Sequence, residues 1–118
     1  MRPGGGDVRA RRLSHLLPLV LSALNNEKRR AILAVLLEAE DKVPFSELKR
    51  RFRVESASLA HHLNKLQQAA LVERTVELAS PRSAKDPYYC YYRATAFARA
   101  FVPRVYEAVE DSAALVTQ

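Results

Sequence analysis

The residues with the clearest chemical potential lie between positions 46 and 69, where a cluster of lysine and arginine precedes a run of serine, histidine and asparagine. Lys and Arg side chains bind phosphate groups, whereas Ser, Asn and His side chains can exchange hydrogen bonds with the edges of bases. The basic cluster is LKRRFR, from Leu48 to Arg53, and the hydrogen-bonding run is SASLAHHLN, from Ser56 to Asn64. Together the two segments predict a surface that contacts double-stranded DNA.

The hydrogen-bonding run is expected to lie on a helix over 56–69 with one apolar face. At 100° per residue the apolar side chains fall on a single stripe. They are Leu59, Leu63, Leu66 and Ala70. The opposite face holds only small or polar side chains, with no acidic residue between Ser56 and Glu73. Such a helix fits the major groove, which is roughly 12 Å wide. We therefore expect base contacts from Ser56, Ala57, Ser58, His61 and Asn64.

Basic side chains surround this helix in the sequence and are expected to contact the phosphates on either side of the groove. The expected phosphate contacts are Arg30, Lys49, Arg50, Arg53, His62, Lys65, Arg82 and Lys85. Arg82 and Lys85 lie in a polar loop between two strand-like segments, and His62 lies at the side of the helix, where it contacts phosphate or braces the helix.

Length and composition are those of one ordinary globular domain. The chain has 118 residues, 48% hydrophobic and 27% charged, with a formal net charge of +6 and a pI of about 9.8. The basic excess favours polyanionic partners. The single cysteine, Cys90, can form neither an intrachain disulfide nor a zinc site of several thiolates. We expect a cytoplasmic, nucleoid-associated protein without a cofactor, a metal or a membrane partner.

Hydrophobic periodicity predicts the elements that position these residues. Helices are expected over 13–24, 27–39, 46–52 and 56–69, strands over 71–78 and 87–93, and a last helix from 95. Asn26 is expected to cap the second helix, and Pro18 and Pro103 to bend or restart the first and last. The predicted fold is mainly α with a small β-hairpin, a winged helix-turn-helix of order α-α-α-α-β-β-α. We expect a flexible basic arm over 1–12, a DNA-binding domain over 13–112 and a tail over 113–118.

Several segments resemble the ArsR-type winged helix-turn-helix regulators. LSALNNEKRRAIL is similar to the opening of that family, FSELKRRFRVESASLAHHLNKLQQAALVER to its central segment, and YYRAT to the end of its second strand. The resemblance covers Leu13 to Val109 and implies a repressor that acts as a homodimer. Two departures matter. SELKRRF lacks the Cys-x-Cys metal site and VYEAVEDSAAL lacks the histidine of the alternative site, so we infer that the chain is not a metal sensor of either type. Ala70 replaces the usual glycine before the first strand.

The first and last helices carry more apolar residues than a small core requires, which independently favours a dimer. The expected dimer interface comprises Leu13, Leu16, Leu17, Val20, Phe101, Val105, Tyr106 and Val109.

A rival hypothesis from another class is a winged helix used for protein–protein interaction without DNA binding. Its partner would then occupy the same apolar first and last helices. An enzyme is not indicated, because all three glycines lie at the N-terminus and no nucleophile–base motif occurs. Cys90, flanked by tyrosines in a predicted strand, is expected to be an inert thiol, with a redox switch as the alternative.

Overall fold

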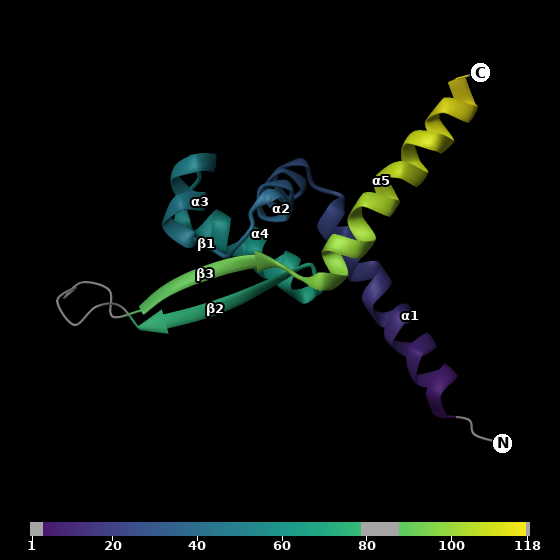
Figure 1. Ribbon diagram of the computed structural model, residues 1–118, viewed down its shortest axis with the longest axis horizontal. Coiled ribbons are helices and arrows are strands. Elements are labelled where there is room, and N and C mark those ends of the chain that lie inside the picture. The colour runs from purple at the N-terminus through teal and green to yellow at the C-terminus, as the bar shows by residue number, and fades with distance from the viewer. Residues whose placement is uncertain (1–3, 79–87, 118) are drawn as a thin grey trace.

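The computed structural model describes residues 4–78 and 88–117, with side chains described for 14–78 and 89–112. In these residues the elements are α1 (Gly4–Leu24), α2 (Glu27–Glu38), β1 (Val43–Pro44), α3 (Phe45–Phe52), α4 (Ser56–Gln68), β2 (Val72–Leu78), β3 (Tyr88–Ala94) and α5 (Ala96–Thr117). In Figure 1, α1 and α5 project from one side of the body and the β2–β3 hairpin from the other. The predicted fold class is confirmed: it is a winged helix-turn-helix.

The core is built from the apolar faces of the helices that the periodicity predicted. Ile32, Leu33 and Leu36 of α2 are at most 1% exposed, as are Leu59, Leu63 and Leu66 of α4. Each such side chain contributes about 1.5–3 kcal/mol when fully removed from water. No polar or charged residue is buried among the described residues. The leucine face of α4 therefore lies in the core, together with Ala69 at the end of the helix.

The sheet has three antiparallel strands in the order β1-β3-β2. Val72 pairs with Ala94 at the base of the hairpin, and Leu78 pairs with Tyr88 at its outer end. Strand β1 was not predicted, because the sequence indicated only a polar break there. It has two residues, of which Val43 is buried and pairs with Tyr92. A strand this short carries no detectable alternation, so only its partner β3 defines it.

Both terminal helices are longer than the sequence predicted. α1 begins at Gly4 and therefore includes most of the expected arm, and α5 ends at Thr117, within the expected tail. Pro18 and Pro103 lie inside these helices. Within the described residues, no helix is long and apolar enough to cross a membrane.

Side chains cap the N-terminal ends of α2 and α5. Asn26 caps α2 as predicted, because its side-chain oxygen accepts a 3.0 Å hydrogen bond from the backbone N–H of Arg29. Thr95 caps α5 in the same way, accepting a 3.0 Å bond from the N–H of Ala98.

α4 ends in a left-handed residue that is not glycine. Ala70 has φ 59, and the bonds Ala70 N–H to Gln67 C=O (2.9 Å) and Leu71 N–H to Leu66 C=O (3.0 Å) form the usual helix-ending pattern around it. The methyl group of alanine disfavours this conformation by about 1–2 kcal/mol.

An Ala70→Gly chain should therefore be more stable by about 0.5–1 kcal/mol, after subtracting the extra freedom of glycine in the unfolded chain. Urea unfolding measures the difference. The control is Ala69→Gly at the adjacent residue, whose φ is −85 and whose side chain is 0% exposed. That change should lower stability, and an equal loss at position 70 would contradict the strain argument.

Candidate nucleic-acid interface

The outer face of α4 is not covered by any other described part of the chain. The leucine face is buried, and all five residues expected to contact bases are exposed: Ser56, Ala57, Ser58, His61 and Asn64. Gln68 continues the face and is exposed as well. This is the arrangement that groove entry requires, because the side chains that would meet base edges point into solvent. Their individual contacts stay a prediction.

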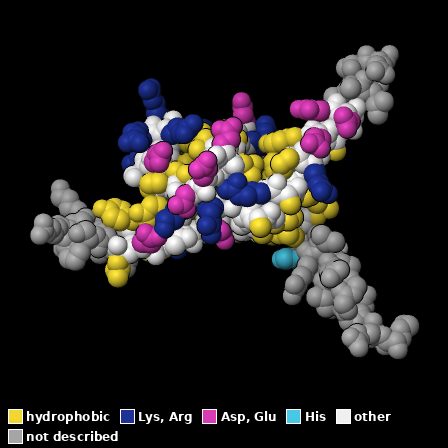
Figure 2. Space-filling model, in the orientation of Figure 1, with side chains coloured by type: hydrophobic (Ala, Val, Ile, Leu, Met, Phe, Trp, Pro, Cys, Tyr) yellow, Lys and Arg dark blue, Asp and Glu magenta, His cyan; other side chains and the backbone are white. Residues whose placement is uncertain are grey.

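A basic group lies immediately before α4. Lys49 and Arg50 are exposed in the last turn of α3, and Arg53 is exposed in the turn that follows. Arg53 is left-handed, with φ 51 and ψ 45, and its N–H donates to the carbonyl of Lys49 at 2.9 Å. This cap stops α3 and reverses the chain into α4. Figure 2 shows Lys and Arg side chains gathered over α3.

Arg30 is placed differently from the expectation that it contacts phosphate. Its Nη1 donates at 2.6 Å to the carbonyl of Leu24, the last residue of α1. Arg29 supports the same helix end, donating from Nε to Ala23 C=O at 3.1 Å and from Nη2 to Ser22 C=O at 3.3 Å. The last carbonyls of a helix have no partner inside it, and two arginines one turn away supply the missing donors. Arg30 is therefore a capping residue, and we leave it out of the proposed interface.

His62 and Lys65 line the edge of the α4 face and are half-buried. The Nδ1 atom of His62 is buried and has no hydrogen-bond partner. Burial is the main cause that lowers the pKa of His62 below its ordinary 6.5, and the charges of Arg29, His61 and Lys28 lower that pKa further. At neutral pH His62 is therefore uncharged and can offer a phosphate only a neutral N–H.

The lowered pKa predicts a pH dependence of folding. Between its folded and unfolded pKa values His62 binds more protons in the unfolded chain, so the free energy of unfolding falls as pH drops below 6.5. Urea unfolding at pH 7.5 and 5.5 measures this loss, which His62→Gln should reduce. His15→Gln, at an exposed position of α1, is the control and should leave the loss unchanged. An equal pH effect in the His62→Gln chain would contradict the assignment.

The β2–β3 hairpin forms the wing. An ion pair between Arg93 and Glu73 at 2.9 Å lies at its base, and Lys42, the residue before β1, forms a second ion pair with Glu77 of β2. Lys42 also lies 4.8 Å from the centre of the Tyr91 ring. The loop with Arg82 and Lys85 lies outside the described residues, so the phosphate contacts expected there stay a prediction.

The tyrosines of β3 differ in burial, since Tyr92 is 5% exposed and Tyr89 is 44% exposed. Cys90 is a half-buried free thiol on β3.

The residues expected at a dimer interface fall into two groups. Leu17, Tyr106 and Val109 are 41–59% exposed, and Leu16, Phe101 and Val105 are partly buried. Val20 is only 2% exposed and belongs to the core of its own chain, which corrects its assignment to the interface. Leu21, one residue further, is 59% exposed and was missed. The side chain of Leu13 lies outside the described side chains.

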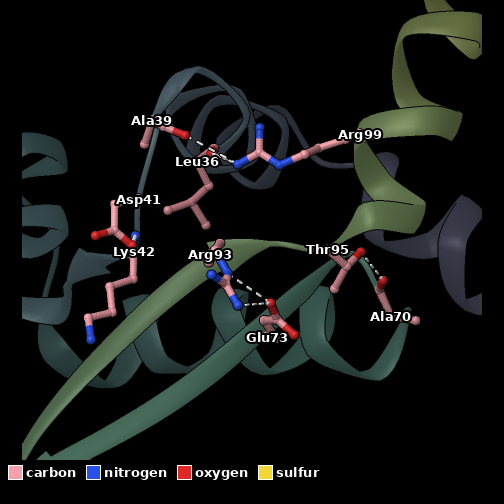
Figure 3. A network of polar contacts seen from close by, with 9 residues as sticks. All are labelled: Leu36, Ala39, Asp41, Lys42, Ala70, Glu73, Arg93, Thr95 and Arg99. Carbon is pink, nitrogen blue, oxygen red and sulfur yellow. Dashed lines mark hydrogen bonds and ion pairs between the residues drawn. The ribbon is translucent and has the colours of Figure 1, made fainter.

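α5 is bonded to both α2 and α4, which the sequence did not predict (Figure 3). Arg99 donates to the carbonyls of Leu37 at 2.9 Å and Ala39 at 3.2 Å, at the end of α2. The hydroxyl of Thr95 donates at 2.6 Å to the carbonyl of Ala70, just after α4. The start of α5 is therefore fixed relative to the α4 face.

The comparisons with known proteins agree with this geometry. The helix-turn-helix domain family model matches residues 24–75. A search of curated proteins found no match.

Solved structures of regulators are similar in fold. An ArsR-like transcriptional regulator from Rhodococcus is 28% identical with a TM-score of 0.56, over 84% of this chain and 83% of that one. A transcriptional regulator homologue from Pyrococcus horikoshii is 20% identical with a TM-score of 0.68, over 90% and 97%. HlyU from Vibrio cholerae is 22% identical with a TM-score of 0.58, over 80% and 92%. The chain therefore contains a helix-turn-helix domain at residues 24–75, and it shares the winged helix-turn-helix fold of these regulators, an ArsR-like one among them.

Proposed function

We propose that this chain is a sequence-specific DNA-binding transcriptional regulator that acts as a homodimer and represses by occluding promoters. The observation that carries the proposal is the outer face of α4, which is exposed, free of acidic residues and preceded by the basic end of α3. The similarity to regulators of known structure supports it. The sequence motifs further favour a regulator that does not sense metals through a Cys-x-Cys site.

Within this proposal the two groups of residues have different roles. Lys49, Arg50 and Arg53 bind phosphates and set affinity for any sequence, whereas the α4 face, including Ser58 and His61, discriminates among bases. In a dimer the two α4 helices would enter half-sites about one DNA turn apart.

Fluorescence anisotropy on two duplexes tests this division: one selected in vitro from random sequence, and one of scrambled sequence. Arg50→Ala should weaken both by the same factor and reduce the slope of log K against log salt by about 0.9. Ser58→Ala and His61→Ala should weaken the selected duplex by roughly tenfold and the scrambled one little. If all three variants act equally on both duplexes, the division of roles is wrong.

The same assay at low salt separates the proposal from a protein-interaction module. If the chain is a regulator, it should bind the scrambled duplex at low salt through phosphate contacts alone. If it is a protein-interaction module, the anisotropy of the duplex should not change, despite the net charge of +6. No binding of either duplex by the unchanged chain would overturn the proposed function.

A further inference from the structure

The two faces of the β2–β3 hairpin differ in how their charges are balanced. Because successive residues of a strand point to opposite faces, Glu73 and Glu77 of β2 share one face, which we call the glutamate face. Each of these carboxylates has a cation, Arg93 for Glu73 and Lys42 for Glu77. Arg74 lies on the opposite face. The charges of the glutamate face are therefore balanced by one another, and Arg74 takes no part in that balance.

The face that carries Arg74 is the one that packs against the helices. Val72 and Tyr92 lie on this face, and both are buried in the core that contains the leucines of α4. The ring of Tyr92 lies 6.2 Å from that of Phe45, the first residue of α3. α4 packs against β2, which is an outer strand of the sheet (Figure 1). The exposed side chain of Arg74 therefore reaches solvent on the side of the hairpin where α3 and α4 lie.

Arg74 is a cation at a position where a strand ordinarily carries an apolar residue, since this face is directed towards the core. Both ion pairs of the described residues involve the glutamate face, so no described carboxylate neutralises Arg74. Its contact is with Tyr92, which pairs with it directly across the hairpin. Burial is the main cause that raises the pKa of Tyr92, and Arg74 opposes it through a hydrogen bond to the hydroxyl and through its charge. A neutral hydroxyl thus holds the guanidinium while leaving its charge unpaired.

We propose that Arg74 binds a DNA phosphate from the middle of β2 and that Tyr92 positions its guanidinium. The phosphate belongs to the strand that borders the groove entered by α4. An unpaired guanidinium suits this role because a phosphate accepts two parallel hydrogen bonds from it. The inference rests on the proposed function and adds a contact that the sequence did not predict. It is separate from the contacts expected of the loop with Arg82 and Lys85.

Fluorescence anisotropy over a series of salt concentrations, with the selected and the scrambled duplex, tests the contact. Arg74→Gln should weaken both duplexes by the same factor, roughly tenfold, and reduce the slope of log K against log salt by about 0.9, the value for one phosphate. The matched control is Arg93→Gln, at an exposed position on the glutamate face. It removes the same charge, and it should change either affinity by no more than about twofold and leave the slope unchanged. Urea unfolding should show that both variants are folded.

A double-mutant cycle tests the positioning role of Tyr92. Tyr92→Phe keeps the buried ring and removes the hydroxyl that Arg74 contacts. In the otherwise unchanged chain it should weaken both duplexes by about threefold, and in the Arg74→Gln chain it should have no effect, because the group that it positions is gone. A purely structural role would weaken DNA binding in both chains.

An unchanged affinity and slope for Arg74→Gln would overturn the contact, and so would an equal loss in Arg93→Gln. A Tyr92→Phe effect that persists in the Arg74→Gln chain would overturn the positioning role. If Arg50→Ala reduces the slope and Arg74→Gln does not, the proposed function stands and this inference alone fails. If the unchanged chain binds neither duplex, the proposed function fails and this inference with it.

Discussion

An Ala57→Glu chain should bind duplex DNA roughly 100-fold more weakly than the unchanged chain. Ala57 is exposed in the first turn of α4, on the face that we propose enters the major groove. A carboxylate there would meet the negative potential of the groove and its phosphates at close range. A glutamate in the first turn of a helix is favourable for the helix itself, so the loss should not come from unfolding. Anisotropy gives the affinity, and urea unfolding confirms the stability.

The matched control is Ala34→Glu, at an exposed position of α2. Both variants change the net charge by the same amount, so Ala34→Glu reports the general cost of an added negative charge. We expect a change of a fewfold there. Equal losses at positions 34 and 57 would mean that α4 does not approach DNA, and the proposed interface would be abandoned.

The chain with Leu17→Glu and Val109→Glu should be a monomer at about 50 µM, where the unchanged chain should sediment as a dimer. Leu17 is 50% exposed on α1 and Val109 is 59% exposed on α5. In the proposed dimer both are covered by the partner, and an unpaired carboxylate buried there costs about 3–5 kcal/mol, enough to separate the subunits. Neither residue belongs to the core of its own chain, so each protomer should keep its fold.

DNA binding should report the same event. Two linked α4 helices bind a duplex with two half-sites about 10²–10⁴ times more tightly than one α4 helix binds one half-site. The double variant should lose this gain in affinity on a two-site duplex. Its affinity for a single half-site should stay unchanged. A double variant that still sediments as a dimer would show that α1 and α5 do not form the interface.

The sequence predicted the elements that carry their own periodic signal. The leucines at 59, 63 and 66 placed α4 and its outer face correctly, because the 3.6-residue repeat of a buried helix is visible in a single segment. The cap at Asn26 was predictable for the same reason, since a polar residue directly before an apolar repeat is a local pattern.

Features that depend on contact between distant segments were not predictable. β1 exists only because β3 lies beside it, and Arg99 reaches the end of α2 from a position more than 60 residues later. Val20 and Leu21 are adjacent and equally apolar, yet only the packing of α1 decides that one is buried and the other exposed. In the sequence Arg30 is not distinguishable from the basic residues expected to bind phosphate. Its bond to the carbonyl of Leu24 depends on how α1 and α2 pack together.

Thr95 joins the start of α5 to the segment that follows α4 through hydrogen bonds. Its N–H donates to Leu71 C=O at 3.1 Å, and its hydroxyl donates to Ala70 C=O at 2.6 Å. The hydroxyl oxygen of Thr95 also accepts a 3.0 Å bond from the N–H of Ala98. A movement of the start of α5 would therefore also move the end of α4. In a dimer formed through α1 and α5, the angle between the two protomers would set the distance between their two α4 helices. That distance would determine how far apart two half-sites on DNA can lie and still be bound together.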